Sequence, residues 1–373
     1  MVDAAAVVIP LLLILCSSTI VHGLQDLPPM QSRWTRRTAK RRLRTENLLS
    51  GIIPPSFLDT TSFDDVHLPV LDAPEISWEC FPDLDPQQGG SLPAGSARAL
   101  RKRRAVEAFA FVARTFVGRH DVLRDQELVV DDTESVNDSD TLIVDAASGA
   151  GNLSVPLASM VGRVLAIDIN EIALQRLSHR CPNVATMCAD LAADIKLPPE
   201  ASVVCSLHGC GSASDLAIQL AVDHRLPFVI SPCCTAKAIT PRVEEETFSP
   251  DPIASFQRSG APSGLLYPRS EWLSQYLNDH RNDYILLAKV ADIGLGPQVS
   301  EEQHRHQRIA KLVVECDRLS SVLETEDYGV QLLRLRDHEG YGKPEIMIGT
   351  PNESKAASRW NDALIGLGIH SER

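Results

Sequence analysis

The fold is decided by the stretch Val144-Asp145-Ala146-Ala147-Ser148-Gly149-Ala150-Gly151-Asn152, a glycine-containing turn that follows a predicted strand and precedes a predicted helix. Glycines at such a turn let the backbone approach a ligand where a side chain would collide. By itself the stretch is a weak signal, because dinucleotide-binding enzymes use a similar loop. The fold class therefore has to be inferred from the sequence on either side of this stretch.

Short apolar runs alternate with helical segments from Thr141 onward, which is typical of βαβ units. Because each run is apolar throughout, we expect strands that are buried on both faces of a parallel sheet. Two final runs, 330–333 and 345–348, are expected to close the sheet as an antiparallel pair. The predicted fold class is α/β, with a doubly wound, mostly parallel sheet and an irregular N-terminal extension. The five parallel runs are 142–144, 164–167, 185–188, 203–207 and 228–230.

Helices are predicted before, between and after these strands. The first is expected over Ser96–Val117, where apolar residues recur at spacings of three and four and Gly118 provides a stop. Amphipathic segments follow at 171–180 and 214–223, and a long helix is expected from about 307 to 324.

One aspartate follows each of the first three runs. Asp145 ends the strand before the glycine turn, where an acid holds the methionine end of a cofactor directly or through water. Asp168 comes 23 residues later, where a carboxylate accepts hydrogen bonds from both ribose hydroxyls. Asp190 follows the third strand, where an acid contacts an adenine amino group. This pattern resembles S-adenosylmethionine-dependent methyltransferases, and the G-x-G-x-x-G loop of dehydrogenases is absent.

The resemblance implies a Rossmann-like methyltransferase fold with S-adenosyl-L-methionine as the cofactor. Ala147 stands where the usual pattern has its first loop glycine. The alternative interpretation is a buried turn with solvated acids. The predicted cofactor-binding residues are Asp145, Ala147, Gly149, Gly151, Asp168 and Asp190.

Two further segments follow the fourth and fifth strands, His208-Gly209-Cys210-Gly211 and Pro232-Cys233-Cys234. With other motifs, they resemble the methyltransferase-like domain of the glutathione S-transferase C-terminal domain-containing proteins, and more distantly a tRNA 2′-O-methyltransferase. The resemblance covers most of residues 96–351, and no glutathione transferase module is recognisable in residues 24–95. The other motifs are Tyr267-Pro268-Arg269-Ser270, the run 287–292 and the run 344–351.

The methyltransferase arrangement makes the fourth and fifth strands neighbours, so we expect His208, Cys210, Cys233 and Cys234 to converge near the transferable methyl group. Methyl transfer depends mainly on alignment. His208 or Asp215 would accept a proton from a hydroxyl or amine acceptor, and Cys233 is the third candidate catalytic residue. Two alternatives stay open: the residues only pack, or His208 and the cysteines hold a structural zinc ion. Because the spacing is not that of a known finger, no metal is expected.

The predicted function is therefore S-adenosylmethionine-dependent methyl transfer to an unknown acceptor, with RNA slightly favoured. RNA is favoured by the kinship with the tRNA enzyme and by the basic run Arg101–Arg104, which is equally compatible with a solvated helix face. The net charge of −13 excludes a general nucleic-acid binder. The alternative is a catalytically inactive methyltransferase-fold protein that binds or scaffolds. The sequence does not indicate an oligomeric state.

The N-terminus carries a signal-like apolar run, Ala4–Cys16, which is too short to span a bilayer. An acid-poor segment rich in Arg, Ser and Thr follows it, and together they resemble the two-part presequence of algae with secondary plastids. We therefore expect a plastid protein with no stable membrane insertion once the presequence is removed. A plain secretory signal is the alternative. Cysteine placement outside disulfide patterns, and a sequon at Asn152 inside the cofactor loop, favour the organelle.

The predicted organisation has five parts. The methyltransferase domain is expected to fold without residues 1 to about 75, because that region shows no periodic apolar pattern. The parts are a signal-like presequence (1–23), a transit-like or disordered segment (24–90), a helical lead-in (91–140), the methyltransferase domain (141–351) and a C-terminal tail (352–373).

Overall fold

A computed structural model gives the structure of the chain, which divides into two compact units. The sheet unit comprises Pro69–Ser263 and Glu326–Arg373, and the helical unit comprises Met1–Leu68 and Gly264–Thr325. The described residues are 44, 48–49, 52, 68–73, 75–76, 78–80, 82, 85, 96–118, 123–124, 127–128, 141–232, 234–235, 265–292, 301–335 and 345–367. The signal-like presequence (1–23), most of the transit-like segment (24–90) and residues 236–264 lie outside them.

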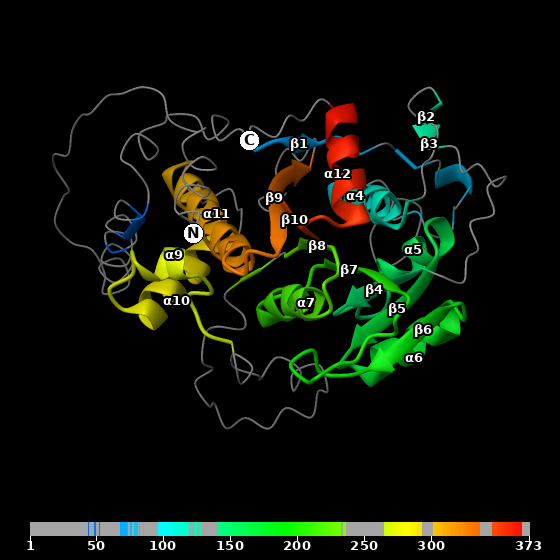
Figure 1. The fold of residues 1–373 in the computed structure, drawn as a ribbon, viewed down its shortest axis with the longest axis horizontal. Helices are drawn as coiled ribbons and strands as arrows, with labels where there is room; N and C mark the ends of the chain where they lie inside the picture. Colours follow the sequence, from blue (N-terminus) through cyan, green and yellow to red (C-terminus); the bar gives the residue numbers. More distant parts are fainter. Residues whose placement is uncertain are drawn as a thin grey trace. The chain divides into compact units, whose positions relative to one another are not determined.

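The sheet unit is built on an eight-stranded sheet with the order β1-β9-β10-β8-β7-β4-β5-β6 (Figure 1). The strands β4 to β8 run parallel, whereas β10 is antiparallel to both β8 and β9. The predicted doubly wound, mostly parallel sheet with a closing antiparallel pair is therefore confirmed. The strands are β1 (Val70–Leu71), β4 (Leu142–Ala146), β5 (Arg163–Asp168), β6 (Val184–Cys188), β7 (Ala201–Leu207), β8 (Phe228–Ser231), β9 (Tyr328–Leu335) and β10 (Glu345–Pro351).

Because β4 lies between β5 and β7, the chain leaves it toward one half of the sheet and later returns to build the other half. Ligands of doubly wound sheets bind beyond the carboxyl ends of the strands at such a point. The glycine turn follows β4 directly, so it lies at this edge. A separate short pair, β2 (Leu123–Arg124) and β3 (Glu127–Leu128), is antiparallel.

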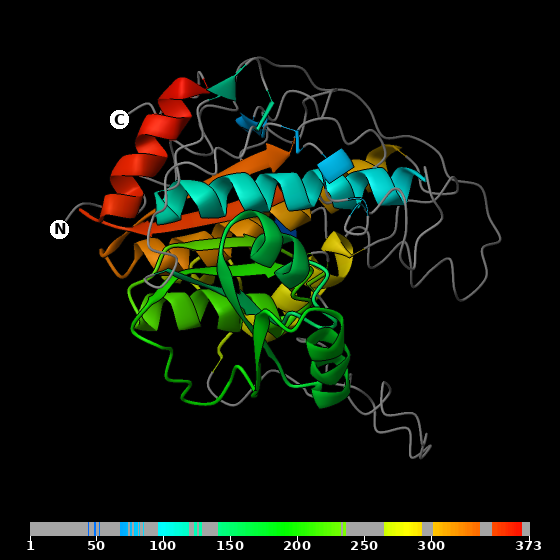
Figure 2. The same cartoon turned by 90° about the vertical axis from the view of Figure 1, so that its right-hand side faces the viewer.

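Helix α4 (Ala97–Val117) covers β7, β8 and β9 on one face of the sheet (Figure 2). The Ser96 hydroxyl accepts a hydrogen bond from the Ala99 amide at 3.2 Å, and Gly118 ends the helix with a φ of 80°. These are the predicted bounds. The sequence explains them, since a serine N-cap and a left-handed glycine are the common terminators of helices.

Three helices of the sheet unit connect the parallel strands. They are α5 (Ser154–Met160), α6 (Glu171–Arg180) and α7 (Ser212–Asp223). Helix α5 contacts α4, whereas α7 packs on β7 and β8 from the opposite face of the sheet (Figure 2). The sheet is therefore covered on both faces, as its continuous apolar strands predict.

The residues expected to form a C-terminal tail contain helix α12 (Lys355–Gly366), which packs on α4 and β10. Its Trp360 ring meets the Phe116 ring edge-on at 5.8 Å between centroids. The Arg359 guanidinium donates to the Phe116 carbonyl at 2.9 Å. The end of the chain is thus part of the folded unit up to Leu367.

The structured part of the sheet unit begins earlier than the sequence suggested. Strand β1 pairs in parallel with β9, with Val70 opposite Arg334. The side chains of Leu71, Ile76 and Trp78 belong to the main apolar core. A boundary at about residue 75 would remove β1 and the Leu71 side chain from the core, and the dispensability of the segment up to 75 stays a prediction that a truncated protein would test. A two-residue strand is too short to show any periodicity.

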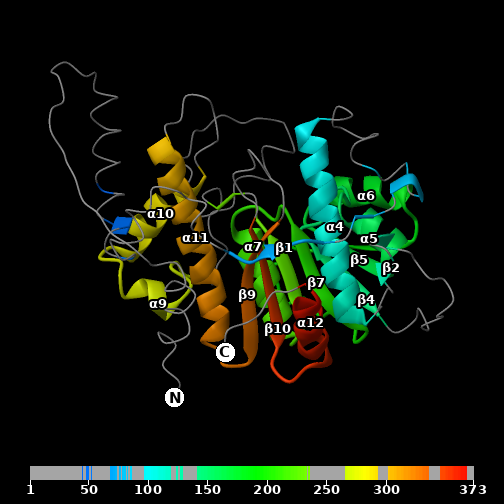
Figure 3. The ribbon, with the colours of Figure 1, turned by 90° about the horizontal axis from the view of Figure 1, so that it is seen from above.

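The helical unit contains α9 (Glu271–Ser274), α10 (His280–Ala291) and α11 (Glu301–Leu323), and α10 lies alongside α11 (Figure 3). Asp317 of α11 fixes the start of α9, because its carboxylate accepts hydrogen bonds from the Ser270 amide at 2.9 Å and the Ser270 hydroxyl at 2.6 Å. Helix α11 begins at Glu301, earlier than predicted, and α9 and α10 were not predicted.

Part of the predicted transit-like segment also contributes to the helical unit. The Arg44 guanidinium lies 2.7 Å from the Asp283 carboxylate, and the Leu48 and Leu49 side chains are buried. Over the described ranges, no helix is both long and apolar enough to cross a bilayer.

Candidate functional site

The turn after β4 has an unusual backbone, with three residues in the left-handed region. The φ angles are 58° at Ala147, 55° at Gly149 and 76° at Gly151. A Cβ added at Gly149 would meet no described atom within 4 Å, whereas one at Gly151 would overlap the Leu177 side chain. The turn therefore needs Gly151 for packing, and its backbone faces open space at Gly149. Ala147 adopts the same conformation without being glycine, at a cost of about 1 kcal/mol.

Two cationic side chains hold this turn from neighbouring helices. The Arg180 guanidinium of α6 donates to the carbonyls of Ala150 and Gly151 at 2.8 and 3.0 Å. The Lys102 ammonium of α4 donates to Asn152 Oδ1 at 3.0 Å. The turn is thus fixed from both sides before any ligand is present.

Asp168 lies directly against the glycine turn. Its Oδ2 accepts a hydrogen bond from the Gly149 amide at 2.7 Å, and its Oδ1 accepts one from the Asn170 amide at 2.8 Å. Each carboxylate oxygen has a second lone pair. Asp168 is therefore oriented by the backbone and retains acceptor capacity for a ligand.

Asp145 is buried beneath the turn, with 1% of its surface exposed. The Ser154 hydroxyl donates to its Oδ2 at 2.5 Å. Burial raises the pKa of Asp145 to about 7, the hydrogen bond from Ser154 acts against that rise, and the Asp168 charge adds to it. A carboxyl group in this environment responds strongly to any charge brought close to it.

Asp190 follows β6 at the same edge of the sheet and is exposed. Its carboxylate accepts a hydrogen bond from the Ala192 amide at 2.9 Å. Sequence reasoning missed two apolar neighbours: Ile169 and Ile172 are each 49% exposed, one directly after Asp168 and one on α6. The sequence signal for this surface was the isoleucine directly after Asp168, because its side chain can make no polar contact there. An exposed apolar surface beside Asp168 suits the face of an aromatic ring.

The acceptor-side segments at the ends of β7 and β8 are joined through their main chains. The His208 amide donates to the Ser231 carbonyl at 3.0 Å, and the Gly211 amide donates to the Cys234 carbonyl at 2.9 Å. The two strands are parallel neighbours, with Leu207 opposite Ser231. The main chains of the His208 and Cys234 segments are therefore joined, and the convergence of their side chains near a methyl donor stays a prediction. Cys233 lies outside the described residues.

His208 itself is exposed and has a φ of 65°. Left-handed backbone at a non-glycine residue is uncommon and is enriched at ligand-binding sites. The neighbouring Gly209 is required, because a Cβ there would overlap the Ser206 hydroxyl, and its carbonyl accepts a hydrogen bond from the Ser214 hydroxyl. Asp215 is buried in the first turn of α7. Of the two predicted proton acceptors, His208 is thus the one exposed to an incoming molecule.

The thiols near this site are better explained as packed side chains than as reactive groups. Cys205 is fully buried beside Asp145, and burial together with the Asp145 charge raises its pKa well above the usual range. Cys210 and Cys234 are not part of a disulfide bond. Within the part of the chain that the structure describes, no group of three or more His, Cys, Asp or Glu side chains is arranged to hold a metal ion.

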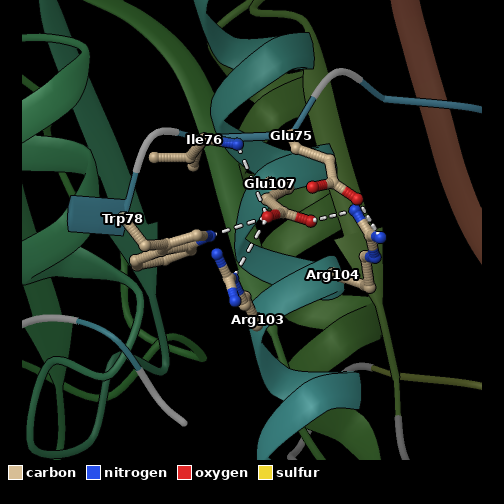
Figure 4. A network of polar contacts seen from close by, with 6 residues as sticks. All are labelled: Glu75, Ile76, Trp78, Arg103, Arg104 and Glu107. Atoms are coloured by element: carbon tan, nitrogen blue, oxygen red, sulfur yellow. Dashed lines mark hydrogen bonds and ion pairs between the residues drawn. The ribbon is translucent and has the colours of Figure 1, made fainter. Parts of the chain in front are cut away.

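The basic run on α4 is engaged inside the sheet unit (Figure 4). The buried Glu107 carboxylate accepts from the Trp78 indole at 2.7 Å and from Arg104 at 3.0 Å, and Arg103 lies 3.6 Å from it. Arg104 also pairs with Glu75, and the Arg103 guanidinium stacks over the Trp78 ring. With Lys102 bonded to the glycine turn, this run serves the fold, so its charge alone does not indicate a phosphate-binding surface.

Comparison with known families agrees with this geometry. A family model described as a methyltransferase domain matches residues 119–240. Residues 119–240 are therefore similar to a methyltransferase domain. The matched region includes the glycine turn, all three aspartates and the His208 segment.

The relatives that match this chain in sequence are the ones that the motifs indicated. The chain is 24% identical over 283 residues to the glutathione S-transferase C-terminal domain-containing protein of Xenopus laevis, covering 74% of this chain and 38% of that protein. The human protein of the same name is 22% identical over 283 residues, covering 74% and 37%. The predicted resemblance is confirmed. The chain spans less than two fifths of the length of these relatives.

Among solved structures, a magnesium protoporphyrin IX methyltransferase from Synechocystis PCC 6803 with bound S-adenosylmethionine is 18% identical. The overlap covers 41% of this chain and 74% of that chain, with a TM-score of 0.26.

Proposed function

We propose that this chain is an S-adenosylmethionine-dependent methyltransferase whose cofactor lies against the glycine turn after β4. The observation that carries the proposal is the position of Asp168. Its carboxylate is held by the Gly149 amide at the carboxyl end of β5, beside a stretch of backbone that faces open space. A carboxylate there suits vicinal ribose hydroxyls, which need two acceptor sites side by side.

The residues present fit the remaining parts of the cofactor. Asp145 suits the positively charged methionine end, and Asp190 suits the adenine amino group at the end of β6. The exposed side chains of Ile169 and Ile172 offer an apolar surface for the adenine ring. When bound, S-adenosylmethionine supplies an electrophilic methyl group on a sulfonium. The work left to the chain is to align an acceptor with that group and to exclude water.

We further propose His208 as the residue that accepts a proton from a hydroxyl or amine acceptor. Its main chain is held by Ser231 of β8 and its side chain is exposed, so the residue is fixed without being enclosed. RNA is the acceptor class to test first. The support for RNA is the resemblance to a tRNA methyltransferase. The α4 basic run adds no support, because it is engaged in the fold.

A second candidate, a protein that binds the cofactor or a partner without turnover, is favoured by one observation. Ala147 holds a left-handed conformation that glycine adopts without strain. The loop therefore retains a conformational cost that glycine at this position would remove. Labelled methyl transfer from S-adenosylmethionine to fractionated cellular RNA and protein separates the two candidates. Transfer to any fraction supports the enzyme, and binding without transfer supports the alternative.

Replacing Asp168 by alanine should weaken S-adenosylmethionine binding by about tenfold to a hundredfold, the range for losing a charged hydrogen-bond acceptor. Titration calorimetry measures the dissociation constant. Asp194→Ala is the matched control, since that carboxylate is exposed and contacts only the neighbouring Lys196 among described residues. Equal affinities in the wild type and Asp168→Ala would remove the assignment.

Replacing His208 by asparagine should lower methyl transfer by about a hundredfold to ten-thousandfold, the usual contribution of a general base. Asparagine tolerates the left-handed backbone, so the loop should keep its shape. Cofactor affinity should stay within about twofold, because the predicted cofactor contacts lie on other strands. His179→Ala, an exposed histidine on α6, is the control. Unchanged transfer in His208→Asn would exclude the proton-accepting role.

A further inference from the structure

Asp145 has an environment that the proposed function does not explain. The predicted cofactor contact is a carboxylate, yet this carboxyl group is 1% exposed and lies at the end of a central strand. Buried carboxylates are stabilised by cationic partners or by several hydrogen bonds. Among the described residues, Ser154 is the one that hydrogen-bonds to Asp145, through its hydroxyl and its backbone amide.

One charged group of the described residues acts on Asp145 and disfavours a negative charge there, the second carboxylate of Asp168 on β5. Cys205 on β7 lies opposite Asp145 in the strand register and is a neutral buried thiol. Ser154, on α5, is neutral. Among the described residues, the groups that act on Asp145 thus include no positive charge.

We propose that Asp145 carries a proton in the cofactor-free protein and releases it to solvent when the cationic cofactor binds, with Ser154 as the residue that positions the carboxyl group for this exchange. The inference rests on the proposed function, since it requires the cofactor at this turn. No bond other than the one between the carboxyl oxygen and its proton is broken.

The physical reason is the charge of the ligand. The sulfonium and the ammonium of S-adenosylmethionine are positive and its carboxylate is negative, so the methionine end brings a net positive charge. A positive charge beside a buried carboxyl group favours the ionised form. Because burial places the pKa of Asp145 at about 7, the exchange falls within the physiological range.

The sign of the pH dependence follows. Since binding releases a proton, a rise in pH strengthens binding as long as Asp145 is protonated in the free protein. Affinity should rise about tenfold per pH unit below about pH 6 and become constant above about pH 8. Near pH 7 about half a proton should be released per cofactor bound, because about half of the molecules carry it.

The test is titration calorimetry of the whole chain with S-adenosylmethionine, from pH 5.5 to 8.5, in pairs of buffers with different ionisation enthalpies. The buffer dependence of the heat counts the protons released. Between pH 5.5 and about 7, where the α-ammonium of the cofactor stays charged, Asp145→Asn should bind with no proton release and with affinity independent of pH. Ser154→Ala should move the midpoint upward by about one pH unit, since it removes a donor to the ionised form. Ser154→Thr, which restores the hydroxyl, should return the midpoint toward that of the wild type.

The outcomes separate the two proposals. Cofactor binding by the wild type without proton release at any pH would overturn this inference and leave the proposed function standing. A folded wild type that binds no cofactor would overturn the proposed function itself. If Ser154→Ala releases the proton with the same pH midpoint as the wild type, Ser154 does not position the carboxyl group of Asp145. If Ser154→Ala does not fold, Ser154→Cys, which keeps the volume and weakens the donor, gives the same reading.

Discussion

Replacement of Glu107 by alanine is expected to lower the free energy of unfolding by about 2–3 kcal/mol, because a buried indole donor and two partly exposed guanidinium groups lose their acceptor. The Glu107 side chain is buried in α4 and binds groups from two segments (Figure 4). The Trp78 indole donates to it at 2.7 Å and Arg104 at 3.0 Å. Alanine would leave an indole donor and a guanidinium without this acceptor.

Urea unfolding followed by circular dichroism measures this effect. Glu107→Gln is the informative companion, because it keeps an acceptor for Trp78 and removes the charge, so its loss should be about half as large. Glu200→Ala is the matched control: its partner Arg163 is half-exposed, and loss of such a pair costs at most about 1 kcal/mol. A Glu107→Ala protein within about 1 kcal/mol of the wild type would show that the network is dispensable.

Replacement of Asp145 by asparagine should stabilise the cofactor-free protein above pH 7 by about 2–4 kcal/mol. The pKa of Asp145 lies near 3.8 in the unfolded chain and at about 7 in the folded one. Between these values the folded state binds the extra proton, so a rise in pH costs stability, and above about pH 7 the cost is complete. Below about pH 4 both states are protonated and the cost vanishes. Asparagine carries no such charge at any pH.

Thermal unfolding of the wild type and Asp145→Asn at several values between pH 4 and pH 8.5 tests this. The difference between the two proteins is the relevant quantity, since other groups titrate equally in both. It should be close to zero at pH 4 and largest above pH 7. A difference that is constant with pH would mean that Asp145 ionises freely in the folded protein.

Most of the fold could be predicted from the sequence because its strands are continuous apolar runs. The runs at Leu142, Val164 and Val203 became central strands, since a fully apolar strand is stable only between two covering layers. The serine and glycine caps of α4 are local signals and were therefore readable. The short strand β1, the four-residue helix α9 and helix α12 were not, because their stability comes from contacts with residues far along the chain.

The candidate site likewise has one part that the sequence predicts and one part that it does not. The positions of Asp145, Asp168 and Asp190 follow from where strands end, and strand ends are visible in the sequence. The burial of Asp215 and the role of Ser154 depend on packing between elements, which no spacing rule expresses. The α4 basic run is the clearest example: four consecutive cations suggest a polyanion surface, but a buried glutamate one turn away uses two of them.

Strand β1 has a consequence for where the chain can be shortened from its N-terminus. In the sheet order it is the neighbour of β9 on the outer side, and the Arg334 amide donates to the Pro69 carbonyl at 2.9 Å. An outer strand with unpaired backbone groups is a template for edge-to-edge association with other chains. Any protease that trims the N-terminus would have to cut before Pro69. A cut beyond Leu71 would remove β1 and leave the backbone groups of β9 open to pairing with other chains, which would favour aggregation.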